Sequence, residues 1–408
     1  MTGGARQGGR RSGTGRWAAV AATLLALPAG YLAVRTAVAE LQSPAVAALP
    51  PSDYRPLLRP LLMLASDPRQ RITGEMAELA RDGAKRAPLA YEPFAIAAAT
   101  ARQQGQIDDA IRLLEEARRR QPNSVLVRLQ LMAAYEKARR FPELLSEMDY
   151  TLRMSDEVRQ VVLPELAKLI RDADGRAALA AVVSEDRAWR GDFFAAAARL
   201  DLRPEHTGDL LRRIQARRSD VGLERGLHMQ ALIAARDYSG AREQWLAMLP
   251  PAGRAASALL FDGGFRGHDA PPPFAWQLRD DEVGRSERVQ PNGAPPYLDV
   301  HYFGGRTVPL AEQLLALPPG RYRLSVHGMS DGGVRVGSLI WHVSCAPGGA
   351  TLGQLKLNEL TPSYARHQMS FVVPVGCAGQ DLRLIGEAGD VAATIDARFA
   401  NLEVAREN

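Results

Sequence analysis

The sequence predicts a multidomain α + β protein with an N-terminal transmembrane helix, an α-helical array and a C-terminal antiparallel β-sandwich. Residues 17–34 carry no charge, and the next two hundred residues repeat apolar side chains every three or four positions, the period of an amphipathic helix. From about residue 255 short alternating runs are bounded by Gly and Pro, which is typical of antiparallel strands. The predicted segments are a basic cytoplasmic tail at 1–16, a transmembrane anchor at 17–39, a Pro-rich linker at 40–52, a helical repeat domain at 53–250 and a β-sandwich domain at 255–408.

The N-terminal segment decides the predicted location. An uncharged helix over residues 17–34 rises roughly 27 Å, close to the hydrocarbon thickness of about 30 Å. Basic residues precede it and none follows until Arg35, which favours a cytoplasmic N-terminus and a periplasmic bulk, so that a single-pass inner-membrane protein is expected. The preceding basic residues are Arg6, Arg10, Arg11 and Arg16.

Two alternatives for this segment stay open. Ala37-Val38-Ala39 before Glu40 is a small-x-small motif of the kind that signal peptidase cleaves, and Pro28 and Gly30 would break the apolar helix upstream of it. A cleaved signal peptide would leave a periplasmic or secreted protein. The other alternative is a buried helix of a soluble domain, which the terminal position and the one-sided charge disfavour.

Charge and cysteine content exclude some classes. The net charge of +5 includes the four arginines of the tail, and 5 − 4 leaves +1 for the rest, so nucleic-acid binding has no electrostatic support. Cys345 and Cys377 are the only cysteines. In an exported chain they favour one disulfide, worth roughly 3–4 kcal/mol in the chain-entropy model, over a metal site or two free buried thiols.

The helical part is repetitive. Pro88 and Pro122 lie 122 − 88 = 34 residues apart, and the residues before each proline agree in type. Thirty-four residues is the period of a helix-turn-helix repeat. In the best copy, small and apolar residues form two facing stripes with Gly105 at the turn between them. The predicted repeat-packing residues are Phe94, Ala97, Ala98, Ala101, Ala110, Leu114, Ala117 and Pro122.

This pattern resembles the tetratricopeptide repeat family, whose units place a bulky residue, small residues at the helix crossing and a closing proline in this order. The resemblance implies stacked helix pairs with a concave surface that holds a protein partner. The next copy keeps its hydrophobicity but loses two small positions, so a generic array of helical hairpins is the alternative. Arginines such as Arg118 and Arg139 are expected to be ordinary solvated side chains.

The C-terminal part alternates with a period of two. Roughly eight or nine short strands predict a two-sheet sandwich. Trp276 and Trp341 are expected to face the core, and Cys345 shares a face with Trp341. The inward positions are Tyr322, Leu324 and Val326, then Leu339, Trp341 and Val343, then Met369, Phe371 and Val373, then Leu382 and Leu384, and finally Ile395, Ala397 and Phe399.

Four phrases in order, Leu260–Phe265, Phe274–Trp276, Pro319–Tyr322 and Ile395–Val404, resemble carbohydrate-binding modules and related jelly-roll domains. That resemblance implies glycan binding by exposed aromatic rings. It also implies a structural calcium ion, and a turn carboxylate without a metal is the alternative; no other cofactor is expected. The candidate glycan-binding residues are Tyr297, Tyr302, Phe303 and Tyr364, and the candidate calcium ligands are Asp262 and Asp396.

No catalytic residue is predicted. The sequence has no His-Glu-x-x-His, Gly-x-Ser-x-Gly or phosphate-binding Gly-x-x-x-x-Gly-Lys motif. Five histidines in the β part make metal binding worth testing, although no two have the spacing of a metal motif. Carboxylate pairs such as Asp280-Asp281 fall in predicted loops, which leaves a glycan hydrolase open.

The sequence therefore predicts a non-enzymatic, membrane-anchored periplasmic scaffold. Its helical array would dock a protein partner and its sandwich would bind glycan or protein, as an accessory to cell-envelope or exopolysaccharide biosynthesis and export; the process is inferred from fold-level analogy. Two alternatives remain, a secreted or anchored glycan-active enzyme and a purely structural assembly protein of an envelope complex.

Overall fold

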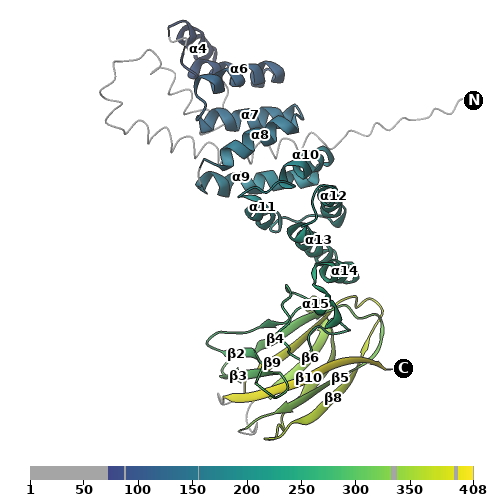
Figure 1. Cartoon of the computed structure of the whole chain (residues 1–408). Helices are drawn as coiled ribbons and strands as arrows, with labels where there is room; N and C mark the ends of the chain where they lie inside the picture. The colour runs from purple at the N-terminus through teal and green to yellow at the C-terminus, as the bar shows by residue number, and fades with distance from the viewer. Residues whose placement is uncertain (1–71, 87–88, 155, 332–337, 390–393, 408) are drawn as a thin grey trace, which may run out of the picture. The chain divides into compact units, whose positions relative to one another are not determined.

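The computed structural model describes residues 72–86, 89–154, 156–331, 338–389 and 394–407. Its first part is helical, as predicted (Figure 1). The helices are α4 (Gly74–Arg86), α5 (Glu92–Gln103), α6 (Ile107–Arg120), α7 (Val125–Lys137), α8 (Phe141–Leu152), α9 (Asp156–Lys168), the 3-10 helix η1 (Leu169–Arg171), α10 (Ala173–Val183), α11 (Arg190–Ala197), α12 (Pro204–Gln215), α13 (Gly222–Ala234), α14 (Tyr238–Met248) and α15 (Pro251–Ala255).

The tail, the anchor at 17–39 and the linker lie outside the described residues. Among the residues that are described, no helix has the length and apolarity needed to cross a membrane. The anchor therefore stays a prediction.

Three helix-to-helix turns share one backbone geometry. Gly105, Arg139 and Arg236 have φ angles of 79°, 57° and 64°, in the left-handed region. In each turn the next residue's N–H donates to a carbonyl five positions back, as Gln106 does to Ala101 at 2.9 Å. This is the hydrogen bond of a Schellman cap, which ends one helix and starts the next. Gly105 and Arg139 are 34 residues apart, so the sequence period corresponds to a repeated helical hairpin.

Most of the predicted repeat-packing residues are buried between α5 and α6. Ala98, Ala101, Ala110, Leu114 and Ala117 are at most 6% exposed. Three others differ from the prediction. Ala97 and Phe94 are partly exposed, because the α5 face against α4 consists of Ala95, Ile96 and Ala99 instead, and Pro122 is exposed. The Phe94 ring is covered by the Arg120 guanidinium, 3.9 Å from its centroid.

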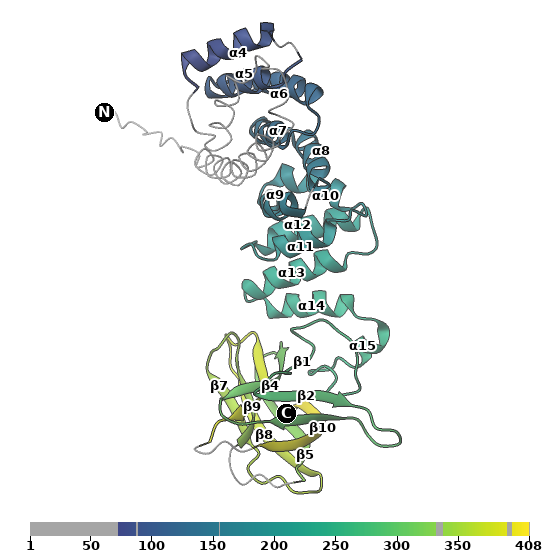
Figure 2. The same cartoon turned by 90° about the vertical axis from the view of Figure 1, so that its left-hand side faces the viewer.

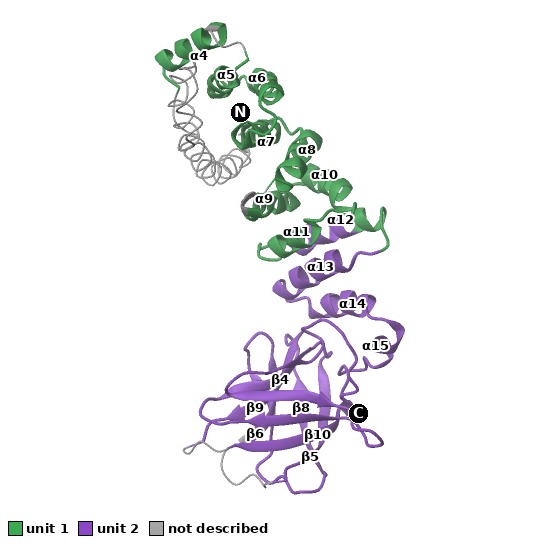
Figure 3. Ribbon diagram, turned by 60° about the vertical axis from the view of Figure 1, so that its left-hand side comes forward, with its two compact units in different colours: residues 1–202, 212–219 green, residues 203–211, 220–408 purple. Residues whose placement is uncertain are grey.

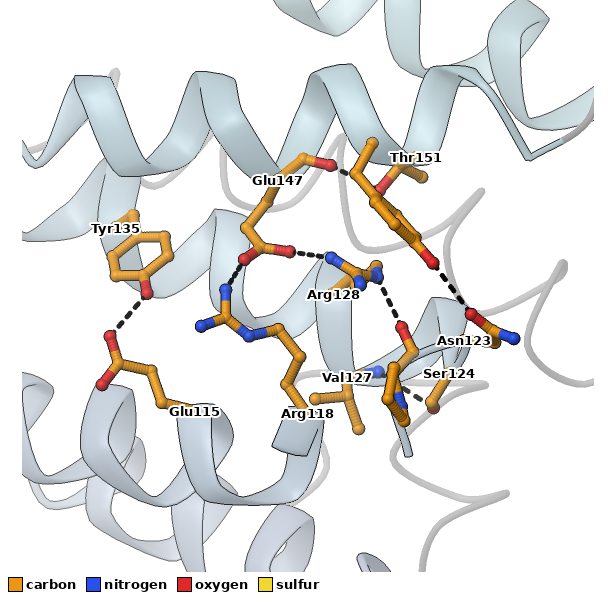
Figure 4. A network of polar contacts seen from close by, with 11 residues as sticks. Glu115, Arg118, Asn123, Ser124, Val127, Arg128, Tyr135, Glu147 and Thr151 are labelled. Atoms are coloured by element: carbon orange, nitrogen blue, oxygen red, sulfur yellow. Dashed lines mark hydrogen bonds and ion pairs between the residues drawn. The ribbon is translucent and has the colours of Figure 1, made fainter. Parts of the chain in front are cut away.

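A buried ion-pair network joins α6, α7 and α8 (Figure 4). Glu147 on α8 is 3% exposed and accepts hydrogen bonds from Arg118 on α6 and Arg128 on α7. Arg128 also donates to the Pro122 carbonyl at 2.9 Å, and its guanidinium lies 3.5 Å from the centroid of the Tyr150 ring. Arg118 is therefore a structural partner of a buried carboxylate, whereas the sequence suggested an ordinary solvated arginine.

Arg139 is more exposed than Arg118 but is also paired. Its guanidinium lies 3.2 Å from the Asp172 carboxylate and 2.6 Å from that of Asp174, and Asp172 caps the N-terminus of α10. The turn that follows α7 is thereby tied to the start of a later helix.

The chain divides into two compact units (Figure 3). The first takes in the described residues up to 202 together with 212–219, and the second takes in 203–211 and the residues from 220 onward. The second unit therefore contains α13 and α14 as well as the β-sandwich, so the compact units do not coincide with the change from helix to strand at Pro250.

Ten strands build the sandwich within the described residues. They are β1 (Gln277–Leu278), β2 (Gly284–Val289), β3 (Tyr297–Tyr302), β4 (Val308–Leu315), β5 (Gly320–Met329), β6 (Ser338–Cys345), β7 (Thr351–Lys356), β8 (Ala365–Val373), β9 (Gln380–Glu387) and β10 (Ile395–Glu407). One sheet has the order β1-β4-β9-β6-β7 and the other β2-β3-β10-β5-β8, with antiparallel pairs throughout.

The sandwich core follows the predicted alternation. The predicted inward residues of β5, β6, β9 and β10 are buried, and on β8 Phe371 and Val373 are buried while Met369 is partly so. Trp341 is fully buried and Trp276 is 7% exposed. The predicted disulfide between Cys345 and Cys377 is confirmed; it joins the end of β6 to the loop before β9.

The hairpin of α13 and α14, which lie side by side in both views (Figure 1, Figure 2), packs on the sandwich. Trp245 on α14 is fully buried against Phe261 and Phe274, with ring centroids 5.0 and 5.7 Å away. The Tyr238 ring lies directly on Gly379, where an added Cβ would come within 2.5 Å of the ring. An aromatic core thus makes this hairpin and the sandwich one unit.

Candidate functional site

One face of the sheet β2-β3-β10-β5-β8 points away from the core. Along β3, Leu298, Val300 and Tyr302 are buried, and the residues that alternate with them face outward. Along β10 the same alternation turns Asp396 and Arg398 outward. These outward residues are direct neighbours, because Asp396 is in register with His301 and Arg398 with Asp299.

A chain of charged groups runs across these strands. The Nδ1 atom of His301 lies 2.7 Å from the Asp396 carboxylate, and its Nε2 atom lies 3.2 Å from that of Asp299. The Arg398 guanidinium is 3.6 Å from the other Asp299 oxygen and 3.3 Å from the Asp331 carboxylate. Every cation in this chain is therefore held between two carboxylates.

This arrangement favours the protonated imidazole of His301. An imidazolium donates hydrogen bonds from both ring nitrogens, and here both face a carboxylate. The pKa of His301 is raised, chiefly by the hydrogen bond with Asp396 and further by the charge of Asp299, while partial burial opposes the rise. The ring is thereby held in a fixed orientation on an exposed surface.

Two tyrosines lie near Arg398, the arginine in this row of charged groups. The Arg398 guanidinium lies 5.7 Å from the centroid of the Tyr297 ring. Tyr364, 44% exposed, lies just before β8 and close enough for Arg398, Tyr297 and Asp299 to act on its hydroxyl. Partial burial is the main cause of the raised pKa of Tyr364, and the nearby Arg398 charge opposes it. We call Tyr297, Asp299, His301, Asp331, Tyr364, Asp396 and Arg398 the tyrosine cluster.

The other two predicted aromatic residues are not part of this arrangement around Arg398. Phe303 is 45% exposed and follows the end of β3, about 7 Å beyond His301 and about 20 Å along the strand from Tyr297. Tyr302 is 1% exposed: its hydroxyl donates to the Arg306 carbonyl at 2.9 Å and its ring covers Gly386. The prediction that Tyr302 contacts a glycan is wrong, because it continues the inward alternation of Leu298 and Val300.

The two candidate calcium ligands both have protein partners. Asp262 is 3% exposed and accepts hydrogen bonds from the backbone N–H groups of Arg266 at 2.8 Å and Gly267 at 3.1 Å. Its carboxylate therefore stabilises the turn that follows it. Asp396 is paired with His301. Among the described residues no group of three or more His, Cys, Asp or Glu side chains is placed to hold a metal ion. Calcium binding stays a prediction.

The carboxylates of Asp280 and Asp281 belong to the turn between β1 and β2. Asp281 accepts hydrogen bonds from the N–H groups of Val283 and Gly284, at 2.9 and 3.3 Å. The Val283 bond is the largest cause of the lowered pKa of Asp281. The backbone of this turn therefore favours the ionised form of Asp281.

Sequence reasoning missed most of the tyrosine cluster. The sequence does hold a signal for three of its members, Asp299, His301 and Arg398. Polar residues alternate with apolar ones as Tyr297-x-Asp299-x-His301 and as Asp396-x-Arg398, which marks the polar residues as outward-facing. The pairing of His301 with Asp396 spans 95 residues and carries no such local signal.

No family model matches this chain, and neither does any curated protein sequence. Solved structures similar to the C-terminal sandwich include a family 61 carbohydrate-binding module in complex with β-1,4-galactotriose, at 15% identity and a TM-score of 0.27 over 37% of this chain and 99% of that one. Others are a family 4 carbohydrate-binding module, at 15% identity and a TM-score of 0.28 over 36% and 99%, and a family 16 module, at 16% identity and a TM-score of 0.25 over 36% and 100%.

Proposed function

We propose that the β-sandwich binds a glycan through the tyrosine cluster and that the protein is a binding protein and not an enzyme. The observation that carries the proposal is a pair of tyrosines on one sheet, Tyr297 on β3 and Tyr364 just before β8, with the ion-paired Arg398 on the intervening strand β10.

The chemistry of the cluster suits sugar recognition. Aromatic rings offer flat apolar faces on which the C–H groups of a pyranose pack, and planar carboxylates and guanidinium groups form paired hydrogen bonds with neighbouring hydroxyls. Asp299, Asp331 and Asp396 are already oriented by His301 and Arg398, so little conformational entropy is lost when a sugar binds.

For the helical part we propose the docking of a protein partner, as in tetratricopeptide repeats. The support is the repeated Schellman turn at Gly105 and Arg139 with its 34-residue spacing. Retention in the inner membrane, a periplasmic location and a role in envelope or exopolysaccharide production are part of the same proposal. They rest on the uncharged segment at 17–34 and on the disulfide, because disulfides are typical of exported proteins.

The test is binding of the purified, oxidised full-length chain to a glycan array, in a detergent without a sugar head group. Tyr364→Ala and Tyr297→Ala should each weaken binding about tenfold, because an aromatic contact contributes about 0.5–1.5 kcal/mol beyond its buried area. Phe303→Ala is the control, since its ring is as exposed as that of Tyr364 and lies about 20 Å along the strand from Tyr297.

Near-UV circular dichroism would show that each variant keeps its fold. Glycan binding that survives both tyrosine changes, or no binding to any glycan, would refute the proposal, and the second result would favour a protein contact. Release of reducing ends from a bound glycan would identify an enzyme instead.

A further inference from the structure

A second feature occupies the opposite end of the same sheet. A shallow cavity of about 420 Å³ is lined by Arg321 and Arg323 of β5 and by Ala405, Arg406 and Glu407 of β10. Arg406 is in register with the buried Tyr322, and its guanidinium lies on the other face, beside Gly320. The charged side chains on the outward face are Arg321, Arg323 and Glu407, so the local charge is 2 − 1 = +1. A cavity with this charge attracts anions.

The carboxylate of this cavity, Glu407, already has two partners within the protein. Arg323 lies 2.6 Å from Glu407, and the Ser370 hydroxyl donates to the same carboxylate at 3.0 Å. These two partners lower the pKa of Glu407, and the charge of Arg321 adds to the effect. Within the described residues Arg321 forms no ion pair, so its charge is open to a ligand.

This cavity and the tyrosine cluster lie on one continuous face. Arg321 and Arg323 alternate with buried residues of β5 and therefore point outward, and Ser325, farther along β5, accepts from the Arg366 guanidinium at 3.4 Å. Six residues of β5 separate Arg323 from Met329, which is in register with Arg398. At about 3.3 Å per residue the two features are about 20 Å apart, with polar side chains between them.

We infer that this cavity is a subsite for an oxyanion on the same glycan chain, so that the ligand is an acidic oligosaccharide of several residues. The inference rests on the proposed function and narrows its ligand class. A guanidinium group binds carboxylate, sulfate and phosphate oxygens in a two-pronged geometry, and a neutral sugar gains little from an open arginine. The oxyanion is the carboxylate of a uronic acid or a sulfate or phosphate ester.

The test compares acidic oligosaccharides on the array with their neutral counterparts of the same backbone and length. The full-length chain should bind each recognised acidic form at least about tenfold more tightly, with the preference shrinking as salt rises. Separate arms with uronate, sulfated and phosphorylated forms identify the source of the oxyanion, and tighter binding of any of them supports the subsite.

Three variants make the test specific. Arg321→Gln should bring the acidic ligand down to the affinity of the neutral one, and Glu407→Gln should tighten the acidic ligand alone, because a competing negative charge is lost. Arg306→Gln is the matched control, since this exposed arginine is paired with Glu282 elsewhere on the sandwich.

Two outcomes are distinguishable. Equal affinity for acidic and neutral forms, or equal effects of Arg321→Gln and Arg306→Gln, would overturn the subsite while the sensitivity to Tyr364→Ala leaves the proposed function standing. Failure to bind any glycan would overturn both.

Discussion

Glu147 provides the sharpest test of how the helical part is held together. Its side chain is 4% exposed, and its partners Arg128 and Arg118 are 7% and 34% exposed. Glu147→Ala removes the only carboxylate that either arginine is shown to contact in the described part of the chain. Arg128 would then remain in the interior as a charge without a counter-ion, which is the costly half of a broken buried pair.

The magnitude follows from this burial. Breaking a buried ion pair typically costs about 3–5 kcal/mol. Two features place Glu147→Ala near the lower end: Arg118 can return to water, and Arg128 keeps its bond to the Pro122 carbonyl and its contact with the Tyr150 ring. We expect a loss of about 3 kcal/mol in the free energy of unfolding of the first unit.

Glu143→Ala is the matched control, because Glu143 lies one turn earlier on α8 and its pair with Arg140 is about 40% exposed on both sides. It should cost less than about 1 kcal/mol. Urea, which does not screen charge, is the denaturant, and hydrogen exchange of α7 and α8 isolates the first unit from the second.

Equal losses for Glu147→Ala and Glu143→Ala would refute the reasoning. A second check is Arg128→Met added to Glu147→Ala, which should recover part of the loss because no unpaired guanidinium remains. Strict additivity of the two changes would mean that the residues are not coupled.

Three further predictions concern the second unit, each measured by urea unfolding. Arg236→Gly should stabilise by about 1 kcal/mol, because the left-handed backbone strains any side chain; an equal gain from Arg236→Ala would contradict this. Replacing Cys345 and Cys377 with Ala should cost about 3–4 kcal/mol for a sequence separation of 32 residues, and a loss below about 1 kcal/mol would argue against the entropic account. The raised pKa of His301 means that its pairing with Asp396 stabilises most below the ordinary histidine pKa of about 6.5 and less as pH rises through the higher folded value, so His301→Gln should cost more at pH 6 than at pH 9; equal costs would show that the proton is not involved.

Sequence patterns predicted the inward faces of the strands because burial acts on every second residue. Trp341 and Phe399 show this directly, and Tyr302 would have been placed correctly had the same count been extended from Leu298. The disulfide could be predicted because only two cysteines exist.

The tyrosine cluster could not be predicted as a unit. Tyr297 and Tyr364 come to the same sheet only through the strand order β3-β10-β5-β8, which depends on long connections and not on any local pattern. Glu147 is a similar case. The sequence predicts that an acidic residue on an amphipathic helix is exposed, and only the packing of the neighbouring helices buries this one. Membership of the tetratricopeptide repeat family and membrane anchoring stay predictions.

The aromatic contact between α14 and the sandwich limits how this protein can be divided or recombined. A cut at Pro250, where helices give way to strands, would strip Trp245 from Phe261 and Phe274 and leave both rings facing water. A gene fusion that moved the sandwich into another protein would have to carry α13 and α14 with it. The unit that can be transferred is therefore the β-sandwich together with its helical hairpin and residues 203–211, which belong to the same compact unit.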